Sequence, residues 1–212
     1  MKRLHLIIML LAAAIVVFGC SKRVTVEIPP RVDLHSFDVI GIVAFDSEAE
    51  GTLPSFATQR FIETMQRAQP GVLVLELGSA EELKEALGLD KLDFAAMQAI
   101  REQYGVEAVI LGDLEVSDMR PNLDLSNMIS SMSLSAEVDA ALSSRMFETR
   151  RGATVWTSST RRTDTVAHVG TNGNGSIRFD AKDPERAYGT LVDALVFDIT
   201  RDFRVTYVTR KR

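Results

Sequence analysis

Residues that carry metal or nucleophile chemistry are scarce in this 212-residue chain, which has one cysteine, Cys20, and three histidines. His5 lies directly before the first apolar stretch, and no close metal-ligand spacing surrounds His35 or His168. The GxSxG, SxxK and GxxxxGKS/T motifs of hydrolases and NTPases are also absent from the sequence. We therefore expect no enzymatic activity, no cofactor and no metal.

The sequence also lacks an apolar run long enough to span a bilayer, which takes about 20 residues. Its longest apolar stretch, Leu6 to Phe18, follows the basic residues Lys2 and Arg3 and ends in small residues. A basic start, a short apolar region and small residues at its end are typical of a secretory signal peptide. We predict that residues 1–19 are a signal peptide and that the chain is exported.

Cys20 follows this stretch directly, in the sequence Val17-Phe18-Gly19-Cys20. This end resembles a bacterial lipobox, and the resemblance implies cleavage before Cys20, a diacylglycerol on its thiol and acylation, for example by palmitate, of its amino group. Ser21 rather than aspartate then favours the outer membrane, on its periplasmic face. Two other interpretations of Cys20 are a buried structural thiol and an unpaired exported thiol that cross-links two chains.

The charge of the chain argues against nucleic acid as a partner. Loss of Lys2 and Arg3 with the signal peptide lowers the formal charge from −5 to −7. Binding a polyanion requires a basic patch, whereas the basic clusters here are short and read as solvated turns and a frayed end: Arg150-Arg151, Arg161-Arg162 and Arg210-Lys211-Arg212.

The segment between the signal peptide and the folded part, residues 20–36, reads as a lipidated tether because it mixes charges with Pro29-Pro30. The globular part is predicted over residues 37–204, and residues 205–212 read as a basic tail.

The first half of the globular part alternates strands and helices. Strands are expected at 37–45, 72–77 and 106–116, and helices at 55–68, with Ser55 as N-cap, at 80–87, with a Ser79-Glu82 capping box, and at 93–104.

The second half of the globular part has a different pattern. Residues 131–148 and 152–166 alternate apolar with polar side chains around Arg150-Arg151-Gly152, which predicts an antiparallel hairpin with one face in water. Asp183-Pro184 begins a helix with an apolar stripe that runs to about Arg204. We predict a single α/β domain whose mixed sheet starts with parallel βαβ units, continues into an antiparallel hairpin and is packed by a C-terminal helix.

Several blocks of this domain resemble one superfamily of bacterial lipoproteins. They are VIGIVAFDSEAEG, GVLVLELGSAEELKEAL, AIREQYGVEAVILGDLE and VDAALSSRMFETRRGATVWTSSTRRT, spread over residues 37–204. The superfamily includes the curli-secretion channel subunit, the outer-membrane activator of penicillin-binding protein and the TolB-like amino-terminal fold. The resemblance implies a non-catalytic adaptor or regulator of envelope assembly, such as a peptidoglycan synthase or secretion system. Its alternative is a self-assembling, curli-type secretion channel or ring subunit.

Acidic side chains follow two strands at the edge where ligands collect in open parallel sheets. Asp46, Glu48 and Glu50 follow the first strand, and Asp113 and Glu115 lie at the end of the third. They predict an edge that binds a cation or a protein partner, with a solvated loop as the alternative. Trp156, the single tryptophan, is either a core anchor of the hairpin or part of a contact surface.

Overall fold

The computed structural model describes residues 23–48, 52–117, 120–123, 134–166, 170–171, 177–178 and 184–211. It contains two compact units: residues 31–204 form one, and the segments that end at Pro30 and begin at Val205 form the other. The predicted signal peptide, Cys20 and Glu50 lie outside the described residues. Among the residues described, no helix has both the length and the apolar character needed to cross a membrane.

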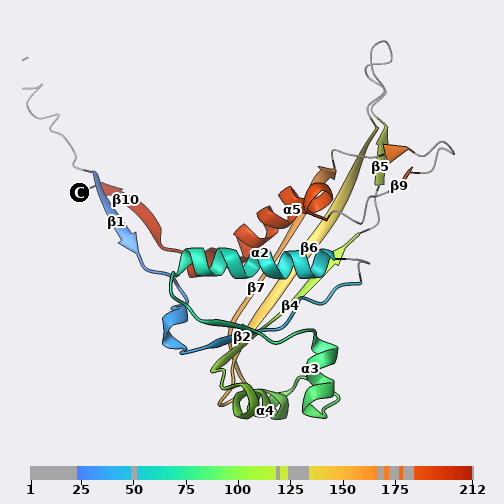
Figure 1. The fold of residues 1–212 in the computed structure, drawn as a ribbon. Coiled ribbons are helices and arrows are strands. Elements are labelled where there is room, and N and C mark those ends of the chain that lie inside the picture. The colour runs from blue at the N-terminus through green and yellow to red at the C-terminus, as the bar shows by residue number, and fades with distance from the viewer. Residues whose placement is uncertain are drawn as a thin grey trace, which may run out of the picture. The chain divides into compact units, whose positions relative to one another are not determined.

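A six-stranded mixed sheet forms the centre of the larger unit (Figure 1). Its strand order is β3-β2-β4-β6-β5, with β7 also paired to β6. β2 lies parallel to β3 and β4, while β6 is antiparallel to β4, β5 and β7. The strands are β2 (Ile40–Ile42), β3 (Val74–Glu76), β4 (Ala108–Val116), β5 (Arg120–Leu123), β6 (Leu134–Glu148) and β7 (Ala153–Val166).

Helices pack on both faces of this sheet. α2 (Leu53–Ala68) and α5 (Pro184–Ile199) cover one face together with the short 3-10 helices η1 (Leu34–Ser36) and η2 (Thr200–Phe203). α3 (Ala80–Leu87) and α4 (Phe94–Tyr104) cover part of the other. A separate two-stranded pairing joins β8 (Gly170–Thr171) to β9 (Ile177–Arg178). The predicted fold class, including the C-terminal helix packed on the sheet, is confirmed.

The alternation of side chains along the strands produces two apolar clusters. Ile40, Ile42 and Ile110 point to the α2–α5 side, where Phe61 and Phe203 are completely buried. Val43 and Val109 point to the α3–α4 side and pack with buried residues of those helices: Leu83, Met97 and Ile100. Because the central strands are apolar on both faces, they are covered on both faces.

Local signals place most helix ends where the sequence predicts them. Ser79 and Glu82 form the predicted capping box of α3, and Asp93 accepts hydrogen bonds from two backbone N–H groups at the start of α4. The prediction that Ser55 caps α2 is wrong, because the helix begins at Leu53 with Thr52 as its N-cap. Pro54 accounts for the earlier start, since its fixed φ suits the first helical turn and it has no N–H to satisfy.

The strands and the closing helix also follow the prediction, with shorter bounds. β2 covers three of the nine residues predicted, although backbone hydrogen bonds continue from Val43 to Asp46 alongside β4. Arg150 and Arg151 form the turn between β6 and β7, and Gly152 there adopts a left-handed φ of 61°. The last helix ends at Ile199 and continues to Phe203 as η2.

Residues expected in the tether and in the tail form regular structure that the sequence reading did not anticipate. β1 (Arg23–Ile28) pairs antiparallel with β10 (Thr206–Lys211), and together they make the β1–β10 ribbon. Leu34 is fully buried in the α2–α5 cluster, so the larger unit begins before residue 37. Residues 23–28 alternate apolar β-branched with polar side chains, and residues 206–209 are β-branched or aromatic, which favours strands once a partner is available.

Gln69, the C-cap residue of α2, joins distant parts of the larger unit. Its side-chain oxygen accepts a hydrogen bond from the backbone N–H of Leu34 at 2.8 Å. Its Nε2 donates to the carbonyl oxygens of Val32 at 2.7 Å and Phe203 at 3.0 Å. The side chain is buried with its polar atoms paired, and the beginning and end of the unit are thereby fastened to the same helix end.

Candidate functional site

The carboxyl ends of β2 and β4 meet at one edge of the sheet. Asp46 and Asp113 form a parallel bridge there. The Asp46 N–H donates to the Gly112 carbonyl at 2.9 Å, and the Leu114 N–H donates to the Asp46 carbonyl at 2.8 Å. The backbone therefore holds two carboxylates as neighbours on adjacent strands, at the edge where the sequence predicts a binding site.

The position of Asp46 depends on how Phe45 crosses β4. A Cβ on Gly112 would overlap Cδ1 of the Phe45 ring, so only glycine leaves room for the ring. Phe45 is buried and packs edge-on against Phe61, with ring centroids 5.2 Å apart. The backbone N–H of Phe45 also donates to the Thr58 hydroxyl on α2 at 2.8 Å. Core packing thus fixes the residue that precedes the site.

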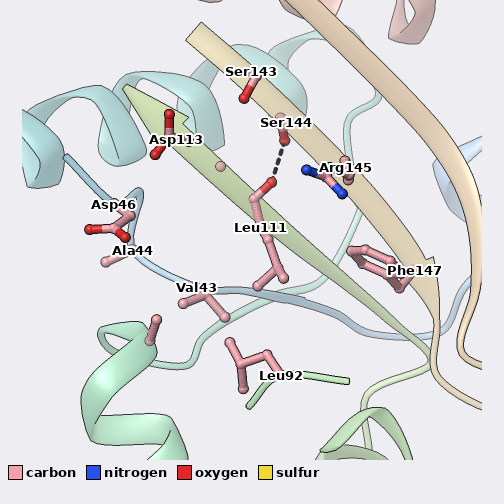
Figure 2. A pocket seen from close by; sticks show the side chains of 12 residues that line it. Val43, Ala44, Asp46, Leu92, Leu111, Asp113, Ser143, Ser144, Arg145 and Phe147 are labelled. Atoms are coloured by element: carbon pink, nitrogen blue, oxygen red, sulfur yellow. Dashed lines mark hydrogen bonds between the residues drawn. The ribbon is translucent and has the colours of Figure 1, made fainter. Parts of the chain in front are cut away.

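A hollow of about 320 Å³ opens beside these carboxylates (Figure 2). The register of β4 and β6 places Leu111 opposite Arg145 and Asp113 opposite Ser143, so these four side chains share the α3–α4 face. Val43, Leu92 and Phe147 line its apolar part, in the lower half of Figure 2. The hollow therefore has an apolar floor with carboxylates, a hydroxyl and one guanidinium at its rim.

A second hollow of about 460 Å³ is lined by residues of β4, β6 and β7, and Asp113 lines both hollows. Glu48, Glu115 and Asp139 contribute carboxylates to it. Arg161 on β7 lies 3.9 Å from Glu115, and both side chains are largely exposed. The hairpin face that carries Ser143, Arg145 and Arg161 is exposed, which confirms the predicted water-facing side of β6 and β7.

The gathered carboxylates change the acidity of Asp113. Partial burial is the main cause that raises the pKa of this carboxyl above its usual range, and the negative charges of Glu115, Asp46 and Glu48 raise it further. Among the described residues, no group of three or more His, Cys, Asp or Glu side chains is placed to hold a metal ion.

The structure brings together four of the six residues that the sequence predicts for an interaction edge: Asp46, Glu48, Asp113 and Glu115. Glu50 lies outside the described residues. Trp156 is apart from them and only 5% exposed, with its ring 4.7 Å from that of Phe203. Its Nε1 donates to Asp202 at 3.2 Å, so this tryptophan is a core anchor with one polar contact.

Sequence reasoning missed the residues that the hairpin adds to the site: Ser143, Ser144, Arg145 and Arg161. The alternation of residues 131–148 shows that one hairpin face is polar, and this signal was available. It does not show which residue of β6 lies opposite Asp113, because the register is set by long-range pairing. Ser144 points to the opposite side of β6 and donates to the Leu111 carbonyl at 2.9 Å.

Comparisons with known proteins find likeness only among solved structures. No family model and no curated protein matches the chain. Similar structures include a PelC dodecamer from Paraburkholderia phytofirmans, 12% identical over 86% of this chain and 98% of that one with a TM-score of 0.45. Lipoprotein GNA1162 from Neisseria meningitidis is 17% identical over 76% and 97%, with a TM-score of 0.40. The LpoB C-terminal domain from Escherichia coli is 15% identical over 60% and 83%, with a TM-score of 0.38.

These structures include bacterial lipoproteins, and the particular superfamily suggested by the sequence stays a prediction.

Proposed function

We propose that this protein is a lipoprotein, anchored through Cys20 at the periplasmic face of the outer membrane, that acts as a non-catalytic adaptor or regulator of an envelope assembly such as a peptidoglycan synthase or secretion system. The observation that carries the binding role is the pair of hollows that share Asp113 on an exposed sheet face, with carboxylates gathered around this residue. Among the described residues that line them, none is a histidine or cysteine, and the groups present suit recognition better than proton transfer or nucleophilic attack.

The anchor is supported by the sequence around Cys20. A basic start, an apolar stretch of signal-peptide length and a small residue directly before the cysteine occur together. Each buried acyl CH₂ contributes about 0.8 kcal/mol, and more than one chain gives stable attachment. A protein held in this way meets its partners at the membrane surface.

The chemistry of the site defines the partner surface that it would accept. Asp46, Asp113 and Glu115 favour lysine or arginine side chains, while the apolar floor formed by Val43 and Phe147 accepts an aliphatic or aromatic side chain between them. Arg145 at the rim would pair with a carboxylate or a backbone carbonyl of the same segment. We therefore propose a protein segment that carries basic residues beside an apolar one.

Site-specific photo-cross-linking in the native envelope tests the binding role. A photo-reactive residue at Ser143 should give a discrete adduct, and one at the exposed Glu102 on α4 should not. The variant with both Asp46→Asn and Asp113→Asn should weaken the adduct several-fold. The variant with both Glu85→Gln and Glu102→Gln, which removes the same charge from exposed helix positions, should leave it unchanged. Adducts of equal yield from positions 143 and 102 would contradict the proposed site.

Labelling with a radioactive fatty acid tests the anchor separately. We expect incorporation into the unsubstituted protein, which should fractionate with the outer membrane, and no incorporation into the Cys20→Ala variant. Label that persists in Cys20→Ala would remove the basis for the anchor, whatever the cross-linking shows.

A self-assembling ring is the second candidate, and the edge strand β7 favours it. This 14-residue strand pairs with β6 on one side, and in the described part of the chain no strand pairs with its other side. A long unpaired edge is a template for association with another copy. Particle size after detergent extraction separates the two candidates, because a large uniform ring would favour self-assembly and a monomer or dimer would favour the adaptor.

A further inference from the structure

The β1–β10 ribbon has two chemically different faces. Directly opposed residues of an antiparallel pair lie on the same face, and successive residues alternate between faces. One face therefore carries Val24, Val26 and Ile28 of β1 with Val208 of β10 opposite Val26, while Arg210 and Thr206 lie opposite Val24 and Ile28 at its two ends. The other face carries Thr25, Glu27, Tyr207 and Thr209, with Arg23 and Lys211 paired at its end.

The apolar face of the ribbon is exposed along its whole length. Val24, Val26, Ile28 and Val208 are each between 39% and 43% exposed. A two-stranded ribbon is marginally stable in water without a surface to pack on. A continuous row of exposed β-branched residues on one face of such a ribbon indicates a surface that covers it.

The position of the ribbon in the chain identifies that surface. β1 begins at Arg23, three residues after Cys20, and three residues of extended chain span at most about 11 Å. If Cys20 carries the acyl chains, the first residue of the ribbon lies in or beside the lipid headgroups, because the headgroup layer is itself about 5–8 Å thick. This step rests on the proposed lipid attachment.

The charges at the same end of the ribbon complement an anionic lipid surface. Arg23 lies opposite Lys211 in the register of the ribbon, and the sequence adds Lys22, Arg210 and Arg212 next to them. Basic residues beside a membrane are attracted to anionic headgroups within a Debye length.

The other end of the ribbon is closed by two prolines. Pro29 and Pro30 lack the backbone N–H that further strand pairing would need.

We propose that the β1–β10 ribbon lies flat on an anionic phospholipid surface, with Val24, Val26, Ile28 and Val208 inserted at the boundary between headgroups and acyl chains. In an upright ribbon the same face would stay in water over its length. In a flat ribbon Thr25, Glu27, Tyr207 and Thr209 face the solvent. Arg210, opposite Val24 on the inserted face, is at the basic end of the ribbon, where its long side chain places the charge among the headgroups. The anchor of the protein is thus a lipid group together with an amphipathic ribbon.

Fluorescence quenching by brominated lipids tests this orientation in the full-length lipidated protein. Vesicles of phosphatidylcholine and phosphatidylglycerol with brominated acyl chains quench only those tryptophans that reach the acyl region. Val208→Trp and Val26→Trp should each lose a large share of the added emission, and Thr209→Trp and Thr25→Trp on the opposite face should keep theirs. The unsubstituted protein, which contains Trp156, supplies the background.

Flotation of the same vesicles distinguishes failure of the flat ribbon orientation from failure of the lipid anchor. Protein that floats with the vesicles but shows equal quenching on the two faces would overturn the flat orientation and leave the lipid anchor intact. Protein that does not float would overturn both. Emission from Val208→Trp that shifts to shorter wavelength without lipid quenching would indicate a protein contact on this face and would also overturn the proposal. Undiminished quenching in vesicles of phosphatidylcholine alone would overturn the role of the anionic lipid.

Discussion

Asp46 and Asp113 lie side by side at the ends of two parallel segments of the sheet, joined through the two backbone hydrogen bonds of Asp46 that flank Asp113. The pairing of β2 with β4 fixes this arrangement, so neither carboxylate can avoid the other by a change of backbone. Neighbouring like charges of this kind cost stability in the free protein, and a basic partner removes the cost. A basic group on the proposed partner would therefore relieve this repulsion.

Replacement of Asp113 by asparagine should stabilise the protein at neutral pH. The pKa of this carboxyl is raised in the folded state by burial and by its acidic neighbours. The folded state thus binds more protons than the unfolded chain between the two pKa values, and stability falls as the pH rises through this window. Denaturant unfolding should show Asp113→Asn above the unsubstituted protein at pH 7. The difference should vanish near about pH 3, below the ordinary aspartate pKa. Glu102→Gln serves as the control, and a gain that is independent of pH would contradict the explanation.

Substitution of Gly112 by alanine should destabilise the protein by about 1–3 kcal/mol, because the new methyl group meets the buried Phe45 ring. Gly41→Ala is a matched control, since its Cβ would meet the end of the flexible Leu77 side chain. Adding Phe45→Leu should recover part of the loss from Gly112→Ala, and a double-mutant cycle measures this coupling. Strictly additive effects would show that the ring and the glycine do not interact.

Replacement of Gln69 by leucine should destabilise the larger unit by about 3 kcal/mol, because unpaired buried polar groups cost about 1–3 kcal/mol each. The change removes the partners of the Leu34 N–H and of the Val32 and Phe203 carbonyls. Gln59→Leu on the same helix replaces an exposed glutamine and should change stability little. Urea unfolding of the two variants provides the comparison, and equal losses would argue against a special role for Gln69.

The adjacent arginines 161 and 162 should differ in their effect on stability. Arg162 donates through Nε to Asp198 on α5 at 2.8 Å, and its second guanidinium contact is 2.6 Å. Arg161 has a 3.9 Å contact with an exposed Glu115. We expect Arg162→Ala to cost about 1–2 kcal/mol and Arg161→Ala less than about 0.5 kcal/mol in thermal or urea unfolding. The reverse order would show that the bridge between β7 and α5 contributes nothing.

Features set by neighbouring residues could be predicted from the sequence. The Ser79–Glu82 box, the Asp93 cap and Gly105 after α4 each act within one helical turn. The alternation in residues 131–166 also revealed the hairpin and its exposed face. These signals are local, so a single sequence contains them.

Features that need a distant partner could not be predicted in the same way. The pairing of Asp113 with Ser143 depends on the register between β4 and β6. The strand character of residues 23–28 depends on residues 206–211, nearly the whole chain away. The role of Gln69 depends on carbonyls at both ends of the larger unit. The acidic edge itself was predicted because parallel strands bring their carboxyl ends together whatever their exact register.

The contacts of Gln69 impose an order of events on the synthesis of this protein. Its bond to Phe203 links residues 134 positions apart, so the α/β unit cannot complete its native hydrogen bonds while the last part of the chain is still being made. A contact over such a long separation forms late and slows folding. An unfinished chain therefore lacks a contact that fastens the end of the unit to α2, and the hydrogen bonds of Gln69 are complete only after Phe203 has been added.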